Sequence, residues 1–162
     1  MSFKIQRGDV TIEGDFSQLE NLISELGKDY SVDVGVLGSQ ATTMRGDSTL
    51  AGIGAQHEFG VPDGKPPIPR RSFIRFPIET GQAQIEAQLG RRYQKHMEEQ
   101  DVKGIFTDIG LAAEARIQEA FETGGFGEWK DLSPETIARK GSETILVDTG
   151  ALRQSITSKV NG

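Results

Sequence analysis

The sequence predicts an α+β fold in which a small antiparallel sheet packs with two long helices and several shorter ones. Two observations lead to this fold class. Short stretches near both ends of the chain alternate apolar and polar residues, which is typical of half-buried strands. Between them, apolar residues recur at helical intervals over about 78–99 and about 105–122, which indicates amphipathic helices. The 162 residues are expected to form one domain, 1–162, with a protruding Pro- and Arg-rich loop at 60–76.

The predicted sheet contains an N-terminal hairpin, a strand at 30–37 and a C-terminal strand at 155–160. The strand at 30–37 reads YSVDVGVL, which places one tyrosine and three valines on the same face. The C-terminal strand is expected to pair with this strand or with the hairpin. After the hairpin, Ser17 and Glu20 have the spacing of a capping box, which predicts a helix at about 16–26.

Further helices are expected between these strands. Residues 50–59 have helical spacing despite two glycines, whereas the polar and aperiodic residues 38–50 before them are expected to form a surface loop. Pro77 is expected to open the first long helix, because a proline at the first helical position loses no needed hydrogen bond. Ser133, which stands ahead of a proline, predicts the start of a short helix near the C-terminus.

The composition excludes several classes of protein. The net charge of −6 disfavours broad nucleic-acid binding, which needs a surplus of Lys and Arg on one face. The absence of cysteine excludes disulfides and thiolate metal sites, and it is compatible with a reducing cytosol. No apolar run approaches the roughly 18 residues of a membrane span, and the N-terminal stretch lacks the apolar core of a signal peptide. We therefore expect no contact with a membrane.

Candidate catalytic and metal-binding residues are few. His57 and Glu58 are adjacent, but a zinc site needs three or four ligands around one point, and Asp63 is the nearest further candidate. We expect the His57 side chain to anchor a loop through a hydrogen bond. His96 falls in the middle of a predicted helix and is expected to be solvated. The chain has no nucleophile-elbow pattern and no phosphate-binding loop. We therefore expect no enzymatic activity, no cofactor and no metal site.

A basic run stands out in this acidic chain, because no acidic residue occurs between positions 64 and 78. Its charged members are Lys65, Arg70, Arg71 and Arg75, and they are interleaved with Ile68, Phe73, Ile74 and Phe76. Three interpretations are open. The run forms a contact with an acidic partner surface, a weak contact with DNA phosphates, or a loop that packs on its own domain.

Three motifs occur in order along the chain. They are AQHEFG at 55–60 followed by IPRRSFIR at 68–75, WKDLSPET at 129–136 with Lys140, and ILVDTGALRQSI at 145–156, where Asp148 and Thr149 offer helix-capping side chains. Together they resemble the virion-morphogenesis and tail-completion proteins of tailed bacteriophages. The sequence departs from the family pattern at Arg71-Ser72, where the family often has a single arginine followed by proline. The first 50 residues carry no motif of this family.

The resemblance implies a structural protein of the virion, a neck or tail-completion subunit at the head–tail junction that assembles as a ring. Its partners would be further copies of itself, the head–tail connector and tail proteins. It would be found in the virion and, during assembly, in the host cytoplasm. We expect the segment 68–76 and the loop around Trp129 to form interfaces. The predicted interface residues are Lys65, Ile68, Arg70, Arg71, Phe73, Arg75, Phe126, Trp129, Leu152 and Arg153.

Two other functions are also compatible with the sequence. A tail terminator or a minor head protein would also be structural and would differ in its place in the particle. A virion-associated cell-wall hydrolase would instead need a cleft that holds His57 or a pair of carboxylates.

Overall fold

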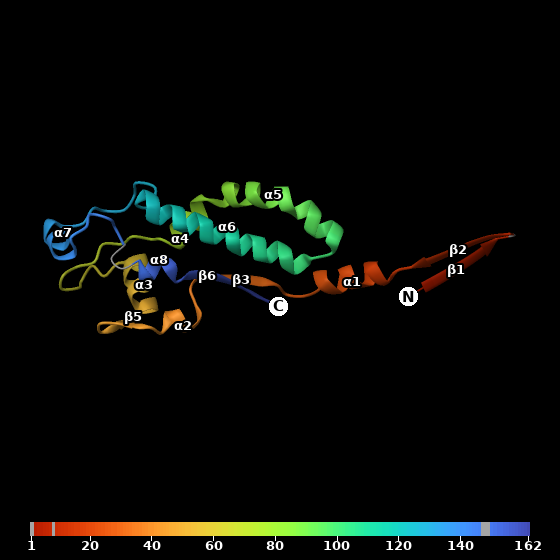
Figure 1. Cartoon of the computed structure of the whole chain (residues 1–162), viewed down its shortest axis with the longest axis horizontal. Coiled ribbons are helices and arrows are strands. Elements are labelled where there is room, and N and C mark those ends of the chain that lie inside the picture. The colour runs from red at the N-terminus through yellow and green to blue at the C-terminus, as the bar shows by residue number, and fades with distance from the viewer. Residues whose placement is uncertain (1, 8, 147–149) are drawn as a thin grey trace.

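The computed structural model describes residues 2–7, 9–146 and 150–162. The fold is α+β, as the sequence predicts. Figure 1 shows an elongated molecule in which two long helices lie along a pair of strands, with an N-terminal hairpin at one end. Shorter helices and connecting loops gather at the opposite end.

The central sheet is an antiparallel pair of strands from distant parts of the chain. Strand β3 (Ser31–Val36) pairs with β6 (Ile156–Asn161), and Val34 lies opposite Ser158 in this register. Of the two partners predicted for the C-terminal strand, the strand at 30–37 is therefore the observed one, and the hairpin is not. In the first half of β3 the valines are half-buried while Ser31 and Asp33 are exposed, and further along the strand Gly35 is buried.

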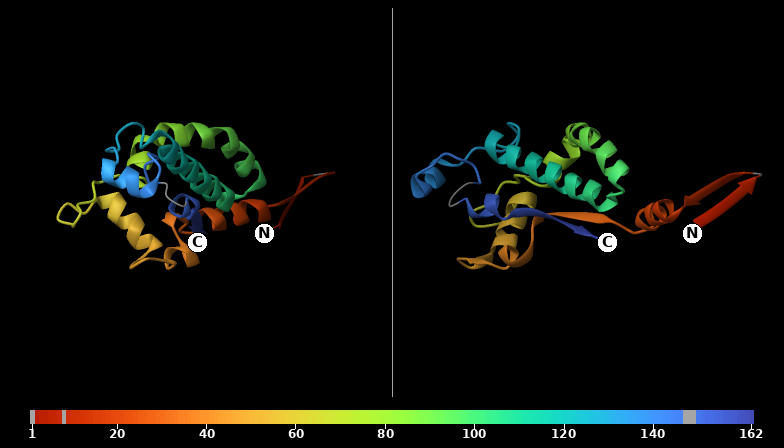
Figure 2. Two further views of the ribbon diagram at one scale, coloured as in Figure 1. Left: turned by 60° about the vertical axis from the view of Figure 1, so that its left-hand side comes forward. Right: turned by 45° about the vertical axis from the view of Figure 1, so that its right-hand side comes forward.

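The two long helices form a second layer on this sheet. Helix α6 (Val102–Thr123) packs on both β3 and β6, and α5 (Gln82–Glu99) lies antiparallel against its other side (Figure 2). Asp101 caps α6 by accepting a hydrogen bond from the Gly104 N–H at 2.9 Å. The core is centred on the C-terminal half of α6, and its buried members are Leu50, Phe73, Ile117, Ala120, Phe121, Trp129, Leu152 and Ile156.

His96 joins the two long helices, so the expectation that it is solvated is wrong. Its Nε2 lies 3.0 Å from the Asp108 carboxylate on α6, and its Nδ1 lies 3.1 Å from the Asp101 carboxylate. The hydrogen bond to Asp108 is the largest cause that raises the pKa of His96 above its usual value.

The first predicted long helix is in fact two helices. Helix α4 (Arg75–Thr80) ends before Gly81, and α5 follows. A Cβ atom at Gly81 would lie 2.5 Å from the Pro77 carbonyl oxygen and 2.6 Å from Nε of Arg116, so this close approach requires glycine. Pro77 is the third residue of α4 and is buried, so the prediction that it opens the long helix is wrong.

The N-terminal hairpin forms a sheet of its own. Strand β1 (Ser2–Arg7) pairs with β2 (Val10–Asp15), and the central sheet contains neither of them. The expectation of one sheet that includes the hairpin is therefore wrong in this respect. Helix α1 (Ser17–Leu26) follows, without the predicted capping box. Instead, the Asp15 carboxylate accepts a hydrogen bond from the Ser17 N–H at 2.9 Å.

Residues 38–50 are more ordered than the predicted surface loop. They contain the one-turn helix α2 (Gly38–Ala41) and the short antiparallel pair β4 (Met44–Arg45) and β5 (Ser48–Thr49). Helix α3 (Leu50–Phe59) follows, as predicted, and the Thr49 side chain caps it by accepting a hydrogen bond from the Gly52 N–H.

The last two helices lie at the end of the molecule opposite the hairpin (Figure 1). Helix α7 (Pro134–Lys140) begins after its predicted cap, since Ser133 Oγ accepts from the Thr136 N–H. Helix α8 (Ala151–Gln154) leads into β6, and the expected capping by Asp148 and Thr149 lies outside the described residues. Within the part of the chain that the structure describes, no helix is long and apolar enough to cross a membrane.

Candidate functional site

Glu58 forms the centre of a junction between α3 and α4. Its side chain is buried, and its carboxylate accepts four hydrogen bonds from one short segment of chain. The donors are the Ser72 hydroxyl at 2.6 Å and the backbone N–H groups of Phe73 at 2.8 Å, Ile74 at 2.9 Å and Arg75 at 3.2 Å. Ile74 is the N-cap residue of α4 and Arg75 its first residue, so two of these N–H groups are ones that a helix leaves unsatisfied at its start, and Glu58 caps α4.

The backbone around Gly60 folds the basic run back onto its own domain. The His57 carbonyl accepts from the Arg71 N–H at 2.7 Å, and Val61 exchanges two backbone hydrogen bonds with Ile68. Gly60 has φ +78°, and a Cβ there would lie 2.9 Å from the Arg70 nitrogen. The predicted protruding loop at 60–76 is therefore shorter than expected, since its tip lies between Val61 and Ile68.

The first and second motifs meet through Arg71 and Trp129. The Arg71 guanidinium donates to the Lys130 carbonyl at 2.9 and 2.8 Å and to the Asp131 carbonyl at 3.2 Å. The Trp129 indole N–H donates to the Ser72 carbonyl at 3.2 Å, and its ring packs edge-on against Phe121 of α6. These contacts hold the loop before α7 against the segment that Glu58 caps.

The third motif is attached to α6 and to the same core. Leu152 of α8 is buried in the core cluster together with Phe73 and Trp129. Arg153 Nε donates to the Gln118 side chain at 2.7 Å, and the Gln118 amide donates back to the Arg153 carbonyl at 3.0 Å. All three motifs, although distant in the sequence, therefore converge on one end of α6.

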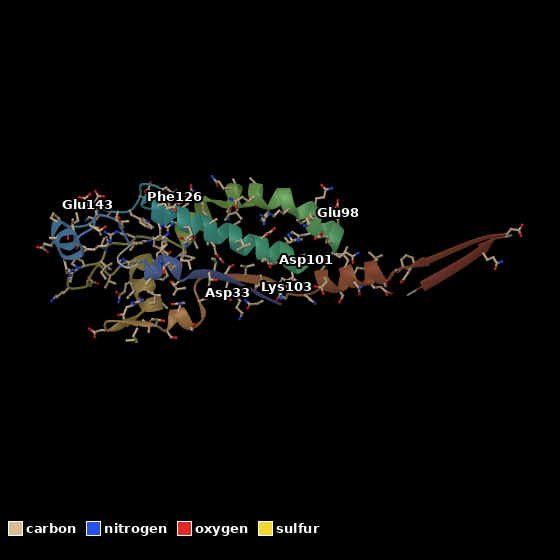
Figure 3. All side chains as sticks on the ribbon, viewed as in Figure 1. Asp33, Glu98, Asp101, Lys103, Phe126 and Glu143 are labelled. Atoms are coloured by element: carbon tan, nitrogen blue, oxygen red, sulfur yellow. The ribbon has the colours of Figure 1, made fainter. Side chains whose placement is uncertain are left out.

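The structure corrects part of the predicted interface. Four of the ten predicted residues, Arg71, Phe73, Trp129 and Leu152, are at most 7% exposed and belong to the chain's own interior. Two others have partners within the chain: Arg153 binds Gln118 and Glu122, and Phe126, beyond the C-terminal end of α6 (Figure 3), stacks under Arg116 at 3.9 Å. Of the remaining four, Lys65 and Arg70 are exposed and Ile68 is half-buried. Arg75 is also exposed and forms a loose ion pair with Glu79 at 3.7 Å.

A cavity of about 430 Å³ opens beside this junction, between α3, α7 and α8. Its walls include the apolar side chains of Leu50, Ile53, Leu132, Leu146 and Leu152. Its charged lining residues are cationic: Arg45, Arg71, Arg139 and Lys140. His57 and Thr136 also line it. No acidic side chain lines the cavity among the described residues. A cavity with this lining is suited to a carboxylate or another small anion attached to an apolar group.

The imidazole of His57 lies in this cationic environment. Burial is the main cause that lowers its pKa to about 4, and the charges of Arg71 and Lys140 lower it further. The ring is therefore neutral at neutral pH. Its buried Nδ1 has no hydrogen-bond partner, so the expectation that the side chain anchors a loop is wrong. The backbone carbonyl of His57 has that role instead.

Sequence reasoning missed Arg45 and Arg139 as members of this site. Neither lies in the basic run, and they come from β4 and α7, which only the fold brings together. No spacing rule connects two residues so far apart in the chain. Within the described ranges, no group of three or more His, Asp or Glu residues is arranged to hold a metal ion.

Comparison with known proteins adds no relative. No protein-family model, no curated protein and no solved structure matches the chain. The functional proposal therefore rests on the three motifs and on the geometry described above.

Proposed function

We propose that this chain is a structural subunit of a tailed-bacteriophage virion, a neck or tail-completion protein at the head–tail junction that assembles as a ring. The observation that carries the proposal is the convergence of the three motifs on one junction. Glu58, Arg71 and Trp129 are occupied there by backbone groups of the same chain. Motif residues that bond to the backbone of their own chain stabilise the fold of the subunit and take no part in a reaction. This is the role expected of motif residues in a family of structural proteins.

The same contacts weigh against the alternative of a cell-wall hydrolase. A hydrolase of that kind needs a carboxylate that can exchange protons with a substrate. The Glu58 carboxylate accepts hydrogen bonds from the Ser72 hydroxyl and three backbone N–H groups and is buried. His57 does face a cavity, but the charged side chains that surround it are cationic. A non-enzymatic role is therefore the better-supported proposal.

The proposed partners are further copies of this chain, the head–tail connector and the tail. The exposed cations Lys65 and Arg70, with Arg75 once its loose ion pair with Glu79 is exchanged, would contact an acidic surface of a neighbour. A weak contact with DNA is the alternative for them. A tail terminator or a minor head protein remains the runner-up function, since either would use the same kind of scaffold. The proposed location is the virion, with assembly in the host cytoplasm.

The test is a stop codon in the gene for this chain, introduced into the phage that encodes it, followed by electron microscopy of the lysate. We expect filled heads and complete tails that are not joined. Supplying the wild-type chain from a plasmid should restore joined particles. Joined, infectious particles without the chain would overturn the proposal, and so would peptidoglycan cleavage by the purified protein that is lost on His57→Ala. Negative-stain images of the purified chain would separately count the subunits of a ring.

A further inference from the structure

The N-terminal part of the chain presents an apolar face that its own domain leaves uncovered. In α1, three large aliphatic side chains at helical spacing are more than half exposed: Leu19 at 52%, Ile23 at 61% and Leu26 at 57%. Helical positions four and seven apart share a face, so these residues form one stripe. An exposed stripe of this kind on a soluble domain marks a contact surface.

The hairpin before α1 also lacks support from the rest of the chain. Strands β1 and β2 pair with each other and make no substantial contact with any other element among the described residues. Figure 1 and both views of Figure 2 show them projecting beyond α1, away from the long helices. A two-stranded hairpin is marginally stable by itself in water, so it gains most from packing on another surface. We refer to residues 2–26, the hairpin with α1, as the N-terminal arm.

The arm and the cationic cavity are complementary in charge and polarity. The N-terminal arm contains five acidic and two basic residues, so its net charge is negative. The cavity has cations from β4, from Arg71 in the segment before α4, and from α7. Its walls are apolar, and no acidic residue lines it among those described. An amphipathic, acidic segment is the kind of ligand that such a cavity accepts.

The arm of one chain does not reach its own cavity. The cavity lies between α3, α7 and α8, at the end of the molecule opposite the arm (Figure 1). The long helices α5 and α6 lie between that end and α1 (Figure 1). A contact between arm and cavity therefore joins two different copies of the chain.

We propose that the cavity between α3, α7 and α8 binds the acidic, amphipathic N-terminal arm of a second copy of this chain. The contact is heterologous, since each copy offers an arm at one end and a cavity at the other. Repetition of such a contact produces a closed ring or an open filament. This contact deepens the proposed function, because it specifies how neighbouring subunits would bind each other. It rests on the proposed function in one respect, the expectation that the repeated contact closes into a ring.

Site-specific cross-linking tests the contact directly, because the natural chain contains no cysteine. One variant carries Ile23→Cys on the arm, and the other carries Thr136→Cys, which lines the cavity without removing a cation. The two purified variants are mixed and treated with a short bis-maleimide. We expect a covalent dimer that contains one chain of each kind. Each variant treated alone should give no dimer, because a head-to-tail contact does not place two arms or two cavities together.

Two controls complete the experiment. Leu111→Cys, on a half-exposed residue of α6, replaces Ile23→Cys in a matched mixture and should give no more product than random collision. Adding Arg139→Glu and Arg45→Glu to the Thr136→Cys chain should lower the yield about tenfold, because like charges across an interface repel. Equal yields with Leu111→Cys, a dimer from Ile23→Cys alone, or no heterodimer at all would each overturn the inference.

The outcome of the cross-linking experiment does not depend on whether the chain acts at the head–tail junction of a phage. A cross-link between arm and cavity, combined with joined particles after the stop codon, would leave the inference standing and remove the head–tail function. Unjoined heads and tails after the stop codon, without a cross-link, would support the head–tail function and overturn the contact between arm and cavity. A filament in place of a ring would support the contact and exclude closure.

Discussion

Replacement of Glu58 by alanine is the sharpest test of the junction. The change removes a carboxylate that accepts hydrogen bonds from the Ser72 hydroxyl and from three N–H groups at the start of α4. Ser72 and Phe73 are buried, so water cannot readily replace the lost acceptor there. Ile74 and Arg75 are closer to the surface, and their N–H groups can be rehydrated.

The expected magnitude follows from these environments. A buried donor without an acceptor costs about 1–3 kcal/mol, so the two buried donors together cost about 2–6 kcal/mol. We therefore expect Glu58→Ala to lower the free energy of unfolding by about 4 kcal/mol, which is a large share of the 5–15 kcal/mol that is typical of a domain. In a chain of this size, that loss corresponds to a fall in the unfolding midpoint of about 8–16 °C.

The fluorescence of Trp129 provides the assay. It is the single tryptophan of the chain, it is buried, and its indole N–H bonds to the Ser72 carbonyl within the junction. Urea and thermal unfolding should be followed by this signal and by circular dichroism. Glu79→Ala is the matched control, because Glu79 is exposed and forms a loose ion pair with Arg75 at 3.7 Å, which is worth at most about 1 kcal/mol. A Glu58→Ala variant as stable as the Glu79→Ala control would refute the capping role.

Three further predictions concern stability. Gly60→Ala should lower the free energy of unfolding by about 1–3 kcal/mol, because a side chain there is strained and strikes the Arg70 backbone. Gly90→Ala should raise it by about 1 kcal/mol, since Gly90 lies inside α5 with open space around it. His57 has its pKa lowered to about 4, so stability should fall as the pH drops from about 6.5 toward 4. Denaturant midpoints measured across that range should vary less in His57→Gln than in wild type.

Much of the fold could be predicted from the sequence, because its elements carry local signals. The alternation of 30–37 and the periodicity of 105–122 depend on neighbouring residues alone, and both elements were expected within a few positions of their observed bounds. The break at Gly81 was missed because its cause is not local. Arg116 of α6 packs against that glycine, and no pattern within the helix itself indicates the contact. The isolation of the hairpin was missed for a similar reason, since the residues of a hairpin do not indicate which other strands it will pair with.

The site was harder to predict than the fold. Glu58 lies within the first motif, but the sequence indicates its neighbour His57 more strongly as a candidate for metal binding or catalysis. The role of Glu58 depends on N–H groups 15 to 17 residues later in the chain, which no capping pattern relates to it. Arg71 and Phe73 looked like anchors for a partner because charged and aromatic residues are typical of interfaces. In the folded chain, Arg71 and Phe73 instead pack in the interior of their own domain.

The distribution of these roles has a consequence for assembly. The motif residues Glu58 and Trp129 are engaged inside the subunit, so they cannot also select its neighbours without unfolding the junction. The uncovered surfaces lie elsewhere, on the N-terminal arm and at the mouth of the cavity, where Arg45 and Arg139 come from segments outside the first motif. Partner choice should therefore be changed by substitutions in the arm or at the cavity mouth that leave stability intact. Substitutions at the motif residues should instead reduce assembly in proportion to the stability that they remove.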